Sequence, residues 1–176
     1  MEINIRRIVA ADVPVLAGIA RKTFYDTFTG TCSEKDMQGF LAEYYSEERL
    51  GREVAIADNY FYFAEIDGKP AGYLQFMEDY SGFPLMQKWK ALELKRIYVL
   101  QEFHGQGLAA RMMDFVMEHA RAGQYEVVWL GVWEHNDRAQ KFYKKYGFVD
   151  SGYTHDFPIG DTPQTDNWLW KFLDKN

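Results

Sequence analysis

The chain has 176 residues, of which 47% are hydrophobic and 26% are charged. This is the length and composition of one ordinary globular domain, and it excludes a disordered, collagen-like or low-complexity protein. The net charge of −6 and the lack of a basic block remove the main electrostatic source of affinity for nucleic acid. A single cysteine, Cys32, excludes an intramolecular disulfide and a cysteine zinc site.

The start of the chain, MEINIRRIVA, lacks the apolar core of a signal peptide, and no apolar run approaches the roughly 20 residues that cross a bilayer. We therefore expect a cytoplasmic protein with no membrane partner, formed as one domain over residues 1–176. Exposed aromatic side chains among the 12 Tyr and 13 Phe are compatible with a homodimer.

The first third of the chain predicts a strand followed by helices. Residues 3–9 alternate apolar and polar side chains, and Asp12 is typical of a residue that caps a helix. Ser33 and Ser46 are the caps expected for two further helices. Helices therefore occupy roughly residues 13–56.

Two aromatic-rich segments follow, at residues 60–64 and 71–76. The dipeptide Asp67-Gly68 between them is a strong hairpin signal, so we expect two antiparallel strands.

The next predicted strand changes phase within its length. Leu92 and Leu94 alternate as its buried side. The apolar residues that follow, Ile97 and Val99, are odd-numbered, so one uniform strand would place them on the opposite face. Either both faces are buried, or an extra residue near Lys95-Arg96 forms a β-bulge, which is the interpretation we prefer.

The second half of the chain alternates helices and strands. A helix with apolar residues at helical spacing follows Gly107 and ends at Gly123. Residues 127–133 are nearly all apolar, as expected of a central strand that lies parallel to the strand before the helix. The remaining predicted elements are a helix over 136–146 and strands at 148–157 and 167–172. Together these elements predict an α+β domain of the α/β/α type, with a mixed, mostly antiparallel sheet of about seven strands and flanking helices.

The segment 99–109 turns from strand to helix through Gly105 and Gly107. Such a turn exposes unpaired N–H groups at a helix N-terminus, which together with the helix dipole favour an anion such as pyrophosphate. The alternative is that the glycines only permit a tight turn. The spelling also matches the dinucleotide pattern Gly-x-Gly-x-x-Gly/Ala, but that pattern needs an acid at the end of the next strand, and Glu126 stands at its start.

This turn, His104-Gly105-Gln106-Gly107-Leu108-Ala109, resembles the acetyl-coenzyme A turn Gln/Arg-x-x-Gly-x-Gly/Ala of the Gcn5-related N-acetyltransferases (GNAT), although His104 departs from its first position. The second signature of that family is Asn-x-x-Ala-x-x-Phe-Tyr-x-x-x-Gly-Phe. It is met in full by Asn136, Ala139, Phe142, Tyr143, Gly147 and Phe148. Segments 24–28, 94–99, 129–134 and 160–166 are similar to the PaiA-type spermidine/spermine N-acetyltransferases.

The resemblance implies an acetyl-CoA-dependent N-acetyltransferase that acts on a primary amine, a polyamine such as spermidine or spermine, by direct attack in a ternary complex. It also implies that the two central parallel strands splay apart and that the bulged strand offers backbone groups to pantetheine. The residues that it implies for acetyl-CoA are Ile97, Tyr98, Val99, His104, Gly105, Gln106, Gly107, Leu108, Ala109, Asn136, Ala139, Phe142 and Tyr143. Those for the amine are Tyr25, Asp26, Phe28 and Asp166.

The resemblance makes Tyr143 the general acid for the coenzyme A thiolate, a role that a phenol is able to perform. Glu93 on the bulged strand and Glu134 at the end of the other central strand are alternative general bases, or simply solvated charges at strand ends. The four histidines lack a zinc-ligand spacing, so we expect no metal.

The sequence leaves two other functions open. One is an NAD(P)-dependent reductase, suggested by the glycine pattern, and the other is a non-catalytic sensor that binds acyl-CoA. The signature at residues 136–148 counts against the reductase, and Tyr143 counts against the sensor.

Overall fold

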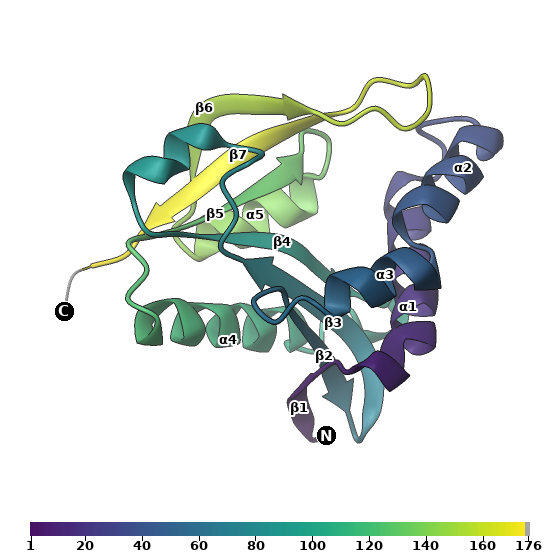
Figure 1. Cartoon of the computed structure of the whole chain (residues 1–176), viewed down its shortest axis with the longest axis horizontal. Helices are drawn as coiled ribbons and strands as arrows, with labels where there is room; N and C mark the ends of the chain where they lie inside the picture. Colours follow the sequence, from purple (N-terminus) through teal and green to yellow (C-terminus); the bar gives the residue numbers. More distant parts are fainter. Residues whose placement is uncertain (175–176) are drawn as a thin grey trace.

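The computed structural model describes residues 1–174. Its strands form one seven-stranded sheet in the order β1-β2-β3-β4-β5-β7-β6, as Figure 1 shows. The strands are β1 (Ile3–Arg7), β2 (Tyr60–Ile66), β3 (Lys69–Met77), β4 (Ala91–Val99), β5 (Val127–Trp133), β6 (Val149–Asp156) and β7 (Thr165–Phe172). The helices are α1 (Val13–Phe28), α2 (Glu34–Tyr44), α3 (Glu47–Val54), α4 (Leu108–Ala122) and α5 (Asp137–Lys145). Among the strands of residues 1–174, β4 and β5 alone pair in parallel, which confirms the predicted fold class.

The starts of α2 and α3 follow from their caps. The hydroxyls of Ser33 and Ser46 accept hydrogen bonds from backbone N–H groups three residues on, at 3.1 and 3.2 Å. Asp12 also precedes its helix, as predicted, but its carboxylate does not cap it. Instead it accepts hydrogen bonds from the Val9 N–H and from Arg6, and so ties α1 to the end of β1.

The hairpin between β2 and β3 turns at the predicted dipeptide. Asp67 and Gly68 both have positive φ, of 49° and 78°. Two successive left-handed residues are what a type I′ turn requires, and this turn matches the twist of the strands that it joins.

The predicted bulge lies in β4. Arg96 pairs with Gln75 of β3 and Leu94 pairs with Phe76, which leaves Lys95 as the extra residue. Because of this residue, the apolar side chains before and after the bulge pack in the same core.

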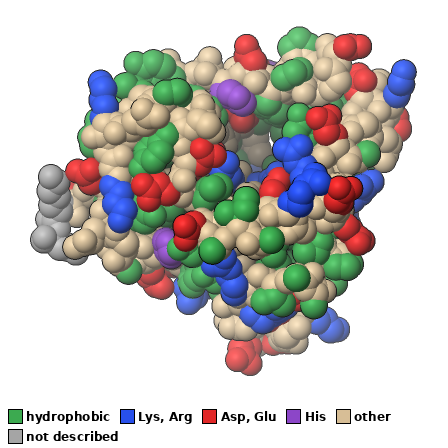
Figure 2. Space-filling view, viewed as in Figure 1, with side chains coloured by type: hydrophobic (Ala, Val, Ile, Leu, Met, Phe, Trp, Pro, Cys, Tyr) green, Lys and Arg blue, Asp and Glu red, His purple; other side chains and the backbone are tan. Residues whose placement is uncertain are grey.

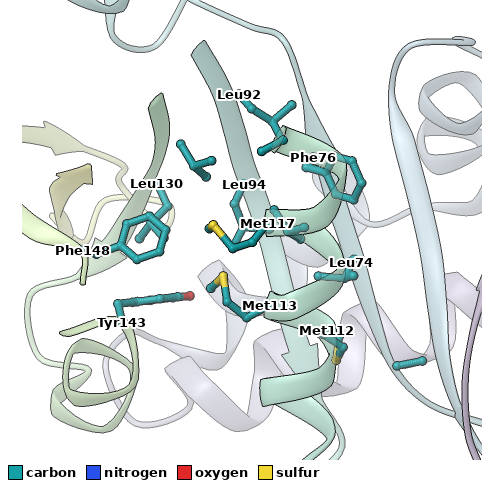
Figure 3. Packing of buried hydrophobic residues seen from close by; sticks show 14 of the residues in the cluster. Leu74, Phe76, Leu92, Leu94, Met112, Met113, Met117, Leu130, Tyr143 and Phe148 are labelled. Carbon is teal, nitrogen blue, oxygen red and sulfur yellow. The ribbon is translucent and has the colours of Figure 1, made fainter. Parts of the chain in front are cut away.

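The two faces of the sheet carry separate cores. One core packs β3, β4 and β5 against α4 and α5, and Figure 3 shows Leu94 and Leu130 facing Met113 and Met117 of α4. The other core packs the opposite face against α1, α2 and α3, which lie together in Figure 1. His119 lies on α4 against the rings of Tyr60 and Phe76, as expected of a packed histidine.

The central strands β4 and β5 pair along only a short part of their length. Ala91, Leu92 and Glu93 pair with residues 127–129, and within the described residues no pairing of β4 with β5 continues beyond them. The two strands therefore diverge after Glu93, which confirms the splayed parallel pair that the family resemblance implied.

Candidate active site

A cleft of about 650 Å³ lies where β4 and β5 diverge. Its walls come from α1, the bulged half of β4, the end of β5, α5 and the start of β7. Figure 2 shows the surface hollowed between the side of the molecule that carries α2 and α3 and the side that carries β6 and β7.

Most of the residues predicted to bind acetyl-CoA lie in this cleft. Those in its lining are Ile97, Tyr98, Val99, His104, Ala109, Asn136, Ala139, Phe142 and Tyr143. Gly105, Gln106 and Gly107 form the adjoining turn outside that lining, and Leu108 is buried in the core instead.

The bulged half of β4 has one paired edge and one edge toward the cleft. Tyr98 and Ile97 pair with β3 on one side, whereas β5 has already diverged on the other. Backbone N–H and C=O groups on that second edge are available to an extended ligand, because unpaired strand edges accept an additional strand.

The glycine turn presents an uncapped helix N-terminus beside the cleft. Gly105 and Gly107 have φ of 77° and 79°, a region that glycine enters without strain. No side chain of the described part of the chain caps the first N–H groups of α4, a helix of 15 residues. Such groups favour an anion through their hydrogen bonds and through the helix dipole.

His104 joins this turn to α5. Its Nε2 lies 2.8 Å from the carbonyl oxygen of Val99, and its Nδ1 lies 2.7 Å from Nη1 of Arg138. A guanidinium only donates, so Nδ1 accepts, and the proton on Nε2 is donated to the Val99 carbonyl. The imidazole thus holds Arg138 at the mouth of the cleft.

Arg138 also borders a second cavity of about 530 Å³ on the outer face of α5. This cavity is lined by Asp137, Arg138, Lys141, Phe142 and Lys145. Three cations and one carboxylate make it a favourable place for an anionic group next to the glycine turn.

Asn136 of the second signature caps the start of α5, because its side-chain oxygen accepts a hydrogen bond from the Ala139 N–H at 3.1 Å. Tyr143 lies two turns further on the same helix and is 7% exposed. Figure 3 shows its hydroxyl pointing away from Phe148 and toward Met113. Burial and the nearby Asp166 carboxylate raise the pKa of Tyr143, so its phenol keeps its proton at neutral pH.

The opposite side of the cleft is aromatic and carries two carboxylates. Its rings are those of Phe24, Phe28, Phe40, Tyr45, Trp133 and Phe157. Asp26, Phe28 and Asp166, which were predicted to bind the amine, all line it. Tyr25 does not, because its hydroxyl is hydrogen-bonded to Glu34 of α2 at 3.1 Å.

The two predicted general bases lie outside the cleft lining. Glu93 is beneath the bulge, where its carboxylate is 3.6 Å from Nζ of Lys95, which also binds Asp79 at 2.6 Å. Burial raises the pKa of Glu93 to about 7. Glu134 is 44% exposed and lies 3.4 Å from Nε2 of His135.

Besides most of the aromatic rings, the site residues that were not singled out from the sequence as functional include Arg96, Arg138 and Gly131. Arg96 lines the cleft with its guanidinium 4.7 Å from the ring centroid of Tyr45. One sequence feature pointed to Arg138: it is a cation in the first turn of a helix, where the helix dipole disfavours positive charge, so a functional role would explain it. Another pointed to Gly131, since a lone glycine inside a strand often marks a close approach.

Two kinds of feature are absent from residues 1–174. No helix in this range is both long and apolar enough to span a membrane. No group of three or more His, Cys, Asp and Glu side chains in the same range is arranged to hold a metal ion.

Comparisons with known proteins agree with this architecture. The chain is 37% identical over 171 residues to an "uncharacterized N-acetyltransferase in pepI 3'region" of Lactobacillus delbrueckii subsp. lactis, covering 97% of this chain and 98% of the relative. It is 29% identical over 155 residues to the N-acetyltransferase Mb2688 of Mycobacterium bovis, covering 88% and 94% of the two chains.

Solved structures share the fold. The crystal structure of the PaiA N-acetyltransferase from Thermoplasma acidophilum in complex with coenzyme A has a TM-score of 0.78 at 22% identity, covering 98% of this chain and 100% of that one. A GCN5-related N-acetyltransferase from Rhodopseudomonas palustris has a TM-score of 0.76 at 16% identity, covering 98% and 97%. The profile of the Acetyltransferase (GNAT) family matches residues 21–148. On this match the chain belongs to the Acetyltransferase (GNAT) family, whose enzymes transfer acyl groups, as its two sequence signatures predicted.

Proposed function

We propose that this protein transfers the acetyl group of acetyl-CoA to a primary amine, by direct attack of the amine in a ternary complex. The observation that carries the proposal is the divergence of β4 and β5 after Glu93, with the glycine turn at one end of the opening and Tyr143 within it. This arrangement offers a strand edge, an anion site and a proton donor to one extended thioester.

The donor half of the site is proposed to bind acetyl-CoA in three parts. Pantetheine pairs with the free edge of β4 along Ile97 to Val99. The pyrophosphate lies at the uncapped N-terminus of α4, and Arg138 adds a charge beside it. The cations of the α5 cavity then face the nucleotide end of the cofactor.

The chemical step needs a polarised carbonyl and a proton for the leaving thiolate. Backbone N–H groups near Tyr98 or Val99 are proposed to donate to the thioester oxygen and stabilise the charge that develops there. Tyr143 is proposed to donate its proton to the thiolate. The phenol is protonated at neutral pH, as this role requires, and its raised pKa makes the proton harder to give up until the thiolate forms beside it. Glu93 and Glu134 reach the acceptor only through water, since neither lines the cleft.

The acceptor is proposed to be a polyamine such as spermidine or spermine. The carboxylates of Asp26 and Asp166 and the surrounding aromatic rings suit alkylammonium groups. Asp26 is already paired with Lys22 at 2.7 Å, which leaves Asp166 as the stronger of the two attractions. Arg96 lies in the same cleft, so amines that also carry a carboxylate belong in the test.

Residues 1–176 are proposed to form one N-acetyltransferase domain that works in the cytoplasm, consistent with the single free thiol of Cys32.

A homodimer is also proposed. Support for it comes from the edge strand β6, where Val149 and Tyr153 are 57% and 51% exposed.

The test is the release of coenzyme A thiol from acetyl-CoA across a panel of spermidine, spermine, amino acids and peptides. Turnover with the polyamines alone supports the full proposal. Turnover only with amino acids or peptides keeps acetyl transfer and removes the polyamine. Tight binding of acetyl-CoA without turnover of any amine identifies a sensor, and NADPH oxidation identifies a reductase.

A further inference from the structure

Asp166 is a carboxylate that no described side chain neutralises. It lies at the start of β7 and lines the cleft. Within residues 1–174, no hydrogen bond or ion pair is made by its side chain, whereas Asp26 is bound by Lys22 and Glu93 lies against Lys95. A largely buried carboxylate without a partner is costly for the fold, so a functional reason for it is expected.

The fold makes room for this carboxylate. Gly131 of β5 lies beside it, and a Cβ there would come within 3.0 Å of Oδ2 of Asp166 and 2.5 Å of the Trp168 ring. Asp166 is paired in register with Trp133, whose ring lines the same cleft. The missing side chain at Gly131 therefore lets the carboxylate lie over β5, between apolar rings and the cleft.

Asp166 and Tyr143 approach the cleft from opposite faces of the sheet. Tyr143 belongs to the core on the α4 and α5 face. Asp166 is two residues from Trp168, which packs with Trp129 on the other face, and alternate residues of a strand share a face. The two groups are close enough for the charge of Asp166 to raise the pKa of Tyr143.

We infer that Asp166 is the catalytic base that removes a proton from the ammonium group of the acceptor. The inference rests on the proposed function. It places the base on the acceptor side of the opening and the acid on the α5 side, with the thioester between them. Burial raises the pKa of Asp166 to about 7, which suits a group that gains and loses a proton near neutral pH.

The proton balance is complete with these two residues. An N–H bond of the ammonium breaks and its proton goes to Asp166. The freed lone pair forms the N–C bond with the thioester carbonyl carbon, the C–S bond breaks, and the sulfur takes the proton of Tyr143. The amide nitrogen loses one further proton, which restores Tyr143 through water, and Asp166 then releases its proton to solvent.

Other titratable groups line the cleft with Asp166 or lie at the position paired with it. They are Tyr143 on α5, His155 at the paired position on β6, His135 against Trp133, and Arg96 across the cleft on β4. The test therefore has to separate Asp166 from these groups as well as from Glu93.

The experiment compares Asp166→Asn with a matched control, Asp156→Asn, which removes an exposed carboxylate from the adjacent strand β6. Thiol release is measured from about pH 5 to 10 with the best amine of the panel. For the unaltered enzyme we expect kcat/KM to level off above pH 7. For Asp166→Asn we expect kcat/KM to be about 100-fold lower at pH 7. Its kcat/KM should keep rising with pH as the fraction of neutral amine grows, because solvent then has to deprotonate the substrate.

A second substrate separates a base from a structural role. A β-fluorinated analogue of the amine has a more acidic ammonium group, so the deficit of Asp166→Asn is expected to shrink about tenfold with it. Should Asp166→Asn not fold, Asp166→Glu is the variant to measure, because it retains a carboxylate. We expect its kcat/KM still to rise and level off near neutral pH, at a lower kcat.

Three outcomes overturn the inference. One is activity of Asp166→Asn within about threefold of the unaltered enzyme with the same pH profile. Another is a deficit equal for both amines at every pH, which indicates positioning only. The third, if Asp166→Asn does not fold, is an Asp166→Glu enzyme whose kcat/KM does not rise and level off near neutral pH. An unaltered enzyme that binds acetyl-CoA but acetylates no amine is distinguishable from these, since it overturns the proposed function first and the inference with it.

Discussion

Arg138 of α5 donates a 2.7 Å hydrogen bond to Nδ1 of His104, which lies 34 residues earlier in the turn before α4. The other ring nitrogen of His104 is bound to the Val99 carbonyl at the end of β4. One imidazole therefore connects the strand edge, the glycine turn and the cation of α5. The residue that departs from the family pattern supports the proposed phosphate site indirectly, through an arginine.

Replacing Arg138 tests the charge at this site. Arg138→Gln removes one exposed charged donor, and we expect the KM for acetyl-CoA to rise about tenfold with kcat nearly unchanged. The control is Lys144→Gln, which removes an exposed cation of the same helix outside both cavities. Equal KM values for the two variants would show that the effect is one of net charge only.

Replacing His104 tests whether it acts through Arg138. His104→Gln retains a donor and an acceptor, so a small change in KM is expected, whereas His104→Ala should raise the KM for acetyl-CoA severalfold. The double variant His104→Ala/Arg138→Gln should have the same KM for acetyl-CoA as Arg138→Gln alone, because both changes remove the same interaction. Additive effects in this double-mutant cycle would show that the two residues act independently.

Tyr143→Phe removes only the hydroxyl of the proposed acid. We expect a folded protein whose turnover falls about 10- to 1000-fold, since general acid catalysis contributes on that order. Tyr146→Phe is the control, because the Tyr146 hydroxyl is bound to the Ala110 carbonyl and lies outside the cleft. Near-normal turnover of Tyr143→Phe would remove this residue from the mechanism.

Gly131→Ala tests the space beside Asp166. The added methyl group would meet the Trp168 ring at 2.5 Å, so we expect a loss of about 1–3 kcal/mol in the free energy of unfolding, as for other overpacked cores. Turnover should also fall because Asp166 is displaced. Gly39→Ala on α2 has nothing within 4 Å of the new Cβ, and helix propensity is expected to stabilise it by about 1 kcal/mol in chemical denaturation.

The stability of the protein should depend on the protonation of Asp166. Its pKa rises from 3.8 to about 7 on folding, because burial favours the neutral carboxyl. The folded state thus binds the extra proton, and this contribution to stability is complete below about pH 4 and lost as the pH rises through 7. Asp166→Asn is therefore expected to have a free energy of unfolding about 4 kcal/mol higher than that of the unaltered protein at pH 8, with the difference vanishing near pH 4. A constant difference across that range would show that Asp166 ionises with an ordinary pKa.

Local patterns determined most of the fold. The change of phase between Leu94 and Ile97 located the bulge, Asp67-Gly68 located the hairpin, and the spacing from Asn136 to Phe148 located α5 with Tyr143 on it. These features depend on the backbone period and on turn chemistry within a few residues, and such information is present in a short stretch of sequence.

The carboxylates show what only the tertiary structure decided. Glu93, Glu134 and Asp166 are all acids near strand ends, and their neighbours in the sequence do not indicate which of them is the catalytic base. Asp166 differs from the other two in its surroundings. Gly131, 35 positions away, has no side chain that would collide with its carboxylate, and no described cation pairs with it in the cleft. Burial and pairing are set by contacts between distant segments, so the electrostatics of this site arise only when β5 and β7 come together.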